Sequence, residues 1–88
     1  MRADKNEVMP LLKTVQGQIG GIIKMVEDDR YCIDISAQLN SAIAILKKIN
    51  VIVLDAHMRG CVKEAFENGN SAEKIDELIE ALNRIISK

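Results

Sequence analysis

The sequence has very few aromatic side chains, one histidine, one proline and only two cysteines. Aromatic residues make up 2% of the chain, as Tyr31 and Phe66, and tryptophan is absent. Two cysteines are too few for the disulfide framework of a small secreted protein. The polar segment 1–7 contains no apolar stretch, so we expect no secretory signal and a cytoplasmic location.

The chain also lacks a long apolar run and an excess of either charge. No run of about 18 consecutive apolar residues occurs, so we expect no membrane span. Twelve basic and 13 acidic residues give a net charge of −1, which weakens a simple case for nucleic-acid binding, because such domains are usually basic. What the sequence does have is a high content of hydrophobic residues, which make up 48% of a chain of only 88 residues. A chain this short has a marginal core of its own, so we expect an oligomer.

Apolar residues recur at helical spacing along nearly the whole chain, and no segment alternates as a strand would. The spacing predicts an all-α protein with one domain over residues 1–88 and helices at about 6–27, 30–66 and 71–87. The turn after the first helix contains Asp28 and Asp29, either of which could cap the second helix.

Three glycines, Gly17, Gly20 and Gly21, lie inside the first predicted helix. Each costs about 1 kcal/mol relative to alanine in a helix interior. We expect close backbone packing against a neighbouring helix to compensate for this cost, although a bend there is the alternative.

The second predicted helix has no glycine or proline from residue 31 to residue 59 and is apolar around most of its circumference. Gly60 marks its end or a kink within it. One partner helix cannot cover such a surface, so we expect a bundle shared between protomers. A heptad-like seam runs along it through Ile35, Leu39, Ala42, Leu46, Ile49, Val53 and Ala56.

His57 and Cys61 are four positions apart, which on a helix places them on one face and within reach of one metal ion. The other thiol, Cys32, begins the same helix and would lie roughly 37 Å from His57 on a continuous helix. The three residues therefore cannot meet within one chain. In an antiparallel pair of long helices, Cys32 of one protomer would face the other two residues of its partner, and a twofold axis would give two identical sites.

Two thiolates and one imidazole favour a soft metal ion, and three ligands suit trigonal Cu(I). Structural zinc prefers four ligands, so a zinc site would need an added carboxylate or water. Taken singly, a helical cysteine is most often a small buried hydrophobe. A nucleophilic dyad of His57 and Cys61 is conceivable, but a short helical chain offers no substrate cleft, so we expect no enzyme.

Three segments of the chain form a distinctive set, namely YCIDI at 31–35, QLNSA at 38–42 and HMRGC at 57–61. Together they resemble the copper-sensing repressor family (CsoR/RcnR), and residues 12–18 with 21–22 resemble that family's first helix. The resemblance implies a three-helix protomer, an antiparallel four-helix bundle in the dimer and a dimer-of-dimers tetramer.

The resemblance also implies a metal site and the residues around it. Cu(I) would be held by Cys32 of one chain with His57 and Cys61 of the other. Tyr31 and Glu77 would contact these ligands, and a carboxylate on the imidazole N–H would fix its orientation. Members that sense nickel or cobalt use an extra ligand near the N-terminus and a histidine for the last cysteine, so Cys61 favours copper.

The implied function is a Cu(I)-responsive transcriptional repressor. Its apo form would bind operator DNA, and Cu(I) would lower the DNA affinity and derepress copper-resistance genes. The family binds DNA through basic residues on the faces of the tetramer, which would here be Lys13, Lys24, Lys47 and Lys48.

Two alternatives stay open at this point. The first is a thiol or persulfide sensor on the same scaffold, joining Cys32 to Cys61 of another chain, although the persulfide-sensing branch lacks the histidine present here as His57. The second is a metal-binding helical oligomer that does not bind DNA.

Overall fold

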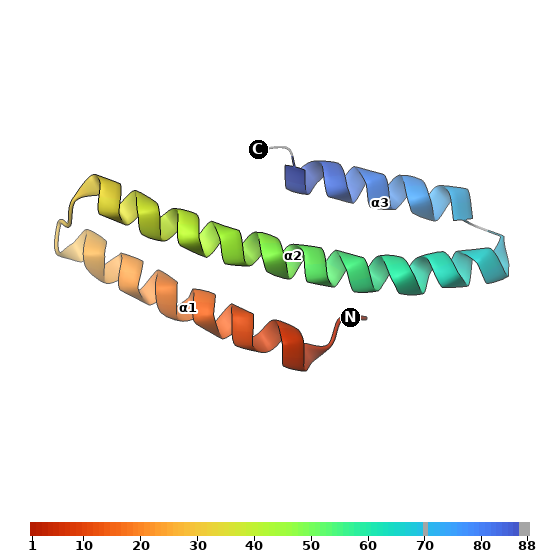
Figure 1. Cartoon of the computed structure of the whole chain (residues 1–88), viewed down its shortest axis with the longest axis horizontal. Coiled ribbons are helices and arrows are strands. Elements are labelled where there is room, and N and C mark those ends of the chain that lie inside the picture. Colours follow the sequence, from red (N-terminus) through yellow and green to blue (C-terminus); the bar gives the residue numbers. More distant parts are fainter. Residues whose placement is uncertain (70, 87–88) are drawn as a thin grey trace. The chain divides into compact units, whose positions relative to one another are not determined.

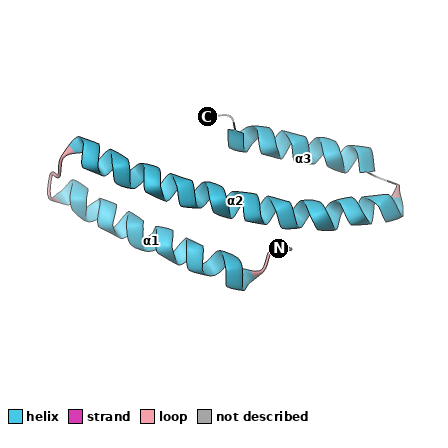
Figure 2. Ribbon diagram, viewed as in Figure 1, coloured by secondary structure: helices cyan, strands magenta, loops and turns pink. Residues whose placement is uncertain are grey.

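The computed structural model describes residues 1–69 and 71–86 of the chain. It contains three helices, α1 (Lys5–Glu27), α2 (Cys32–Asn68) and α3 (Ser71–Ile86), as Figure 1 shows. The described residues include no strand (Figure 2). The all-α, three-helix prediction is thus confirmed, and the predicted helix ends lie within two residues of the observed ones. Position 87, where the last predicted helix ended, lies outside the described residues.

Two compact units divide the chain, and α2 contributes to both of them. The N-terminal hairpin, Lys5–Ile49, contains α1 and the first half of α2. The C-terminal hairpin combines Met1–Asp4 with the chain from Asn50 onward, and so contains the second half of α2 and α3. Within each hairpin the two helical segments run antiparallel (Figure 1).

A Schellman-type turn ends α1. The Arg30 N–H donates to the Met25 carbonyl at 2.9 Å, and the Asp29 N–H donates to the Val26 carbonyl at 3.1 Å. Asp29 has a φ of 52°, the left-handed conformation that this motif requires and that glycine usually supplies. Asp29 therefore terminates the first helix.

Tyr31 occupies the position before the first residue of α2. Its carbonyl accepts hydrogen bonds from the N–H groups of Asp34 at 3.0 Å and Ile35 at 3.2 Å, as expected of an N-cap residue. The prediction that Asp28 or Asp29 caps this helix is therefore wrong, because the left-handed turn places both residues before the cap.

The core of the N-terminal hairpin is small. Its most buried side chains, each at most 7% exposed, are Val8, Val15, Ala42 and Ile49. The last two belong to the heptad-like seam of α2, so part of that seam packs against α1. Leu39 and Leu46 lie on the same seam but stay 45% and 44% exposed. The hairpin thus covers only part of the apolar surface predicted to be shared.

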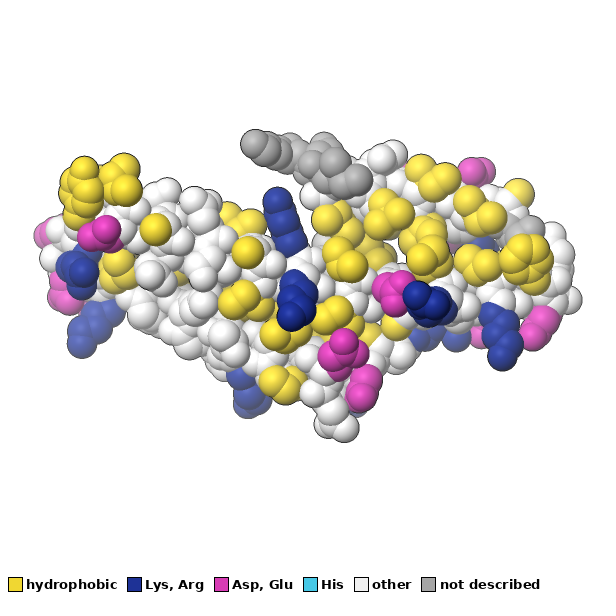
Figure 3. All heavy atoms as spheres, viewed as in Figure 1, with side chains coloured by type: hydrophobic (Ala, Val, Ile, Leu, Met, Phe, Trp, Pro, Cys, Tyr) yellow, Lys and Arg dark blue, Asp and Glu magenta, His cyan; other side chains and the backbone are white. Residues whose placement is uncertain are grey.

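Large apolar side chains are exposed on all three helices, and Figure 3 shows them gathered on the visible face of the C-terminal hairpin. By length and composition alone, α2 is long and apolar enough to cross a membrane. This does not indicate membrane insertion, because Lys47 and Lys48 place two charges in the middle of the helix and charges are costly in hydrocarbon. Uncovered aliphatic surface of this extent is typical of a protein-protein interface.

The glycines of α1 have no close neighbour within the part of the chain that the structure describes. A Cβ atom placed at Gly17, Gly20 or Gly21 would meet nothing within 4 Å. The prediction that a neighbouring helix packs closely against them is wrong for the single chain. Helical periodicity instead places these glycines on the same face of α1 as the exposed Lys13 and Lys24.

Candidate metal centre

The structure brings His57 and Cys61 together on the second half of α2. The Cys61 Sγ lies 3.4 Å from the His57 Nε2, and the helix continues unbroken through both residues to Asn68. The imidazole is 48% exposed and the thiol is free and half-buried. Two soft to intermediate donors one helical turn apart could together contribute two ligands to a soft metal ion.

Glu77 approaches the same imidazole from α3. Its Oε1 lies 3.9 Å from the His57 Nε2, and its Oε2 lies 3.6 Å from the Nζ of Lys74. The first distance is too long for a hydrogen bond but within the range of an ion pair when the imidazole is protonated. Glu77 therefore lies near the histidine and on a different helix.

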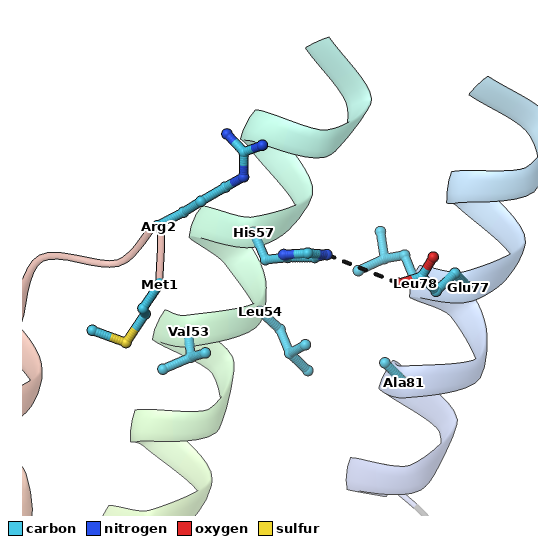
Figure 4. A pocket seen from close by; sticks show the side chains of 8 residues that line it. All are labelled: Met1, Arg2, Val53, Leu54, His57, Glu77, Leu78 and Ala81. Atoms are coloured by element: carbon cyan, nitrogen blue, oxygen red, sulfur yellow. Dashed lines mark ion pairs between the residues drawn. The ribbon is translucent and has the colours of Figure 1, made fainter. Parts of the chain in front are cut away.

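A cavity of about 270 Å³ opens beside His57 within the C-terminal hairpin. Figure 4 shows Met1 and Arg2 on one side of the imidazole and α3 on the other. Apolar side chains dominate the remaining lining, namely Val53, Leu54, Leu78 and Ala81. The imidazole thus borders a mostly apolar space, in which charged groups interact more strongly than in water.

Cys32 and Tyr31 belong to the other unit, at the start of α2 in the N-terminal hairpin. Cys32 is an exposed free thiol, and Tyr31 is 68% exposed. Within the described residues, no group of three or more histidine, cysteine, aspartate or glutamate side chains is arranged to hold a metal ion. One chain therefore supplies the His57 and Cys61 donors together and Cys32 separately.

Arg2 and Glu64 flank the donor pair, and sequence reasoning did not find them. The Arg2 Nη2 donates to the Glu64 Oε1 at 2.5 Å, so that the N-terminal segment is tied to α2 across 62 positions of sequence. The only sequence signal was Gly60, an unexplained glycine that we expected to end or kink the helix. The helix in fact continues through Gly60, and the Arg2 side chain lies against that position.

The ion pair perturbs both of its members. The hydrogen bond to Glu64, followed by Coulomb attraction to it, raises the pKa of Arg2, and the charge of Cys61 adds a smaller contribution in the same direction. The hydrogen bond from Arg2, followed by its positive charge, lowers the pKa of Glu64. The guanidinium is thus close enough to Cys61 for their charges to interact.

The lysines predicted to contact DNA are all exposed and all lie in the N-terminal hairpin. No ion pair joins any of them to an acidic group in the described part of the chain, so their charges are available to an external partner. They are Lys13 and Lys24 on α1 and Lys47 and Lys48 on α2.

Comparison with known proteins defines the class. Residues 4–84 match the family described as metal-sensitive transcriptional repressor. The chain is 35% identical over 81 residues to the copper-sensing transcriptional repressor CsoR of Bacillus subtilis (strain 168), covering 92% of this chain and 80% of that protein. The chain therefore belongs to the metal-sensitive transcriptional repressor family.

Two solved structures share the fold. The copper-sensing repressor CsoR with Cu(I) from Geobacillus thermodenitrificans NG80-2 aligns with a TM-score of 0.82 and 34% identity, covering 94% of this chain and 86% of that one. The nickel-responsive transcriptional regulator InrS aligns with a TM-score of 0.79 and 28% identity, covering 97% and 96%. Copper-responsive and nickel-responsive proteins thus share this scaffold, so the fold alone does not determine the metal.

Proposed function

We propose that the chain is a cytoplasmic Cu(I)-responsive transcriptional repressor, with Cu(I) held by His57 and Cys61 of one chain and Cys32 of another. The 3.4 Å approach of the Cys61 Sγ to the His57 Nε2 is the observation that carries the proposal. The similarity to copper-sensing repressors over most of the chain supports it. Since one described chain gathers only two such donors, the third comes from a second copy.

The donor set favours copper over nickel. Two thiolates and one imidazole suit the low coordination number of Cu(I), whereas nickel prefers more nitrogen or oxygen ligands. The chain has one histidine, and its N-terminal segment carries Arg2, Ala3 and Asp4. None of these side chains adds the imidazole nitrogen that a nickel site of this kind would recruit.

Glu77 provides a route from the metal to the rest of the protein. Because this carboxylate lies on α3 and the imidazole lies on α2, a change in the charge or tilt of His57 acts on both helices. Binding of the proposed metal to His57 would thereby change how α3 packs against α2. In the proposed repressor this change lowers DNA affinity.

The proposed DNA contact uses many weak charges. A tetramer repeats each of the four exposed lysines four times, so weak local positive charges add up along one DNA contact although each chain carries a net charge of −1. Binding of this kind depends steeply on salt, because each neutralised phosphate releases counterions.

The test is an anaerobic Cu(I) titration of the protein bound to genomic fragments that it enriches from a digest. Saturating Cu(I) is expected to lower DNA affinity by about 5- to 150-fold, the usual range of allosteric coupling. The Cys32→Ser variant is the matched control, because it should bind the fragment normally and lose the Cu(I) response. Unchanged affinity at saturating Cu(I) contradicts the mechanism, and Ni(II) run in parallel identifies a nickel sensor.

Two further readouts address the alternatives. Both thiols are free and Cys32 is exposed, so they are available for oxidation. A covalent dimer on non-reducing electrophoresis after persulfide treatment, formed without metal, would favour a sulfur-based signal. A digest that yields no enriched fragment would favour a metal-binding oligomer that does not bind DNA.

A further inference from the structure

The first four residues form a strap that packs on the C-terminal hairpin. Met1–Asp4 group with the chain from Asn50 onward, although α1 begins directly after them and belongs to the other unit. Ala3 is only 7% exposed, so the strap is anchored by burial as well as by charge. Arg2 extends from it to Glu64, one turn beyond the candidate metal donors.

Gly60 makes room for the strap. A Cβ atom at this position would lie 2.6 Å from the Cδ of Arg2 and 2.8 Å from its Cζ, far inside van der Waals contact. The stem of Arg2 therefore lies flat against α2 where the helix has no side chain. Gly60 directly precedes Cys61, so the arginine crosses the helix beside the thiol.

The strap also covers one side of the histidine. Met1 and Arg2 line the cavity that borders His57, on the side away from Glu77 (Figure 4). An ion or reagent approaching the donor pair from this side meets the strap first. Arg2 ties the strap to α2 through a half-exposed ion pair with Glu64.

We propose that Arg2, seated on Gly60 and paired with Glu64, is a positioning residue that holds the strap over the His57–Cys61 pair and limits access to the Cys61 Sγ. Only the consequence for metal exchange rests on the proposed function. If Cu(I) binds these donors, the strap slows its transfer to and from the site.

The test measures the alkylation of Cys61 by iodoacetamide in full-length, metal-free protein carrying Cys32→Ser, so that one thiol reacts. The rate is followed from neutral pH to the plateau at high pH. The plateau reports access to the thiolate, and the midpoint reports the charge around it. Three variants release the strap by different means, namely Arg2→Ala, Glu64→Gln and Gly60→Ala.

The expected result is a plateau rate about two- to fivefold higher in each variant, because an exposed ion pair holds the strap closed only part of the time. Gly60→Ala keeps every charge, so it should raise the plateau of the alkylation rate with little change in the midpoint of its pH profile. The charge swap Arg2→Glu with Glu64→Arg should restore slow alkylation. Arg59→Ala is the matched control, because it removes a nearby guanidinium that pairs with Asp55 on the same helix.

Plateau rates equal to that of the parent in both Gly60→Ala and Glu64→Gln overturn the proposal, provided circular dichroism shows that both variants are folded. The rate of Cu(I) transfer from the protein with native Cys32 to a chromophoric chelator is measured separately. Failure of that protein to bind Cu(I) overturns the proposed function, while the alkylation rates still decide the role of the strap.

Discussion

Gly20 offers a direct test of whether the lysine-bearing face of α1 is open. Apart from the adjoining backbone of α1, nothing in the described part of the chain lies within 4 Å of a Cβ placed there, so Gly20→Ala adds a methyl group without a clash. Alanine is favoured over glycine in a helix interior by about 1 kcal/mol. For a domain of this size, 1 kcal/mol shifts the melting temperature by roughly 4–8 °C. We therefore expect Gly20→Ala to melt several degrees above the parent.

Gly69 supplies the matched control. A Cβ at this position also meets nothing within 4 Å, but its φ is +80°, which disfavours any residue with a side chain. Gly69→Ala should lower stability by about 1 kcal/mol, since the left-handed conformation costs 1–2 kcal/mol for an L-residue. Thermal unfolding by circular dichroism at two protein concentrations measures both variants. A lower melting temperature for Gly20→Ala would refute the reasoning and indicate that another chain packs against this glycine.

Three further predictions follow from individual contacts. Asp29→Gly should stabilise the protein by about 0.5 kcal/mol in thermal unfolding, because glycine removes the cost of the left-handed turn. A lower stability of the variant would show that contacts of the aspartate side chain stabilise the turn by more than its φ destabilises it. Arg2→Ala should raise the pKa of Glu64 toward its ordinary value of 4.5, as measured by carboxyl NMR titration. Since the pairing lowers that pKa, its stabilising effect is full above pH 4.5 and lost as the pH falls through the lowered value; an unchanged titration in the variant would contradict the pairing. Leu46→Glu should dissociate the proposed oligomer in sedimentation and lower Cu(I) affinity at least about tenfold, whereas Cys32→Ser should lower the Cu(I) affinity and leave the proposed oligomer intact; tight Cu(I) binding by a Leu46→Glu monomer would exclude a shared site.

The helices could be predicted because their signals are local. Apolar spacing of three and four residues gave three helices with ends close to the observed ones, and the spacing of His57 and Cys61 predicted that their side chains meet. Both inferences depend only on helix periodicity, which acts within a few turns. The cap of α2 was mispredicted because the left-handed turn at Asp29, which no local pattern indicated, places the N-cap at Tyr31.

The strap could not be predicted because its contacts are long-range and sparse. Arg2 reaches Glu64 across 62 positions, and no periodic pattern connects them. Gly60 was visible as an anomaly, but a glycine in a helix can mean a kink, an end or a close neighbour. Only the packing of Arg2 against that position decides among these, and it shows that the missing side chain accommodates another side chain of the same protein.

A second copy of the chain would both cover the exposed apolar surface of α2 and supply the third donor that one chain lacks beside His57 and Cys61. Leu39 and Leu46 leave part of the α2 seam exposed between Cys32 and His57, so the uncovered apolar surface lies between the candidate donors along the helix. In the proposed oligomer, a second α2 packed antiparallel on this seam would cover the leucines and set the start of one helix beside the later part of the other. Burial of the seam would then supply the association energy, and the proposed metal would add a link between chains that are already held together. A sensor built in this way can respond to the metal without unfolding when the metal leaves, because its assembly depends on the leucines and its signal depends on the thiols.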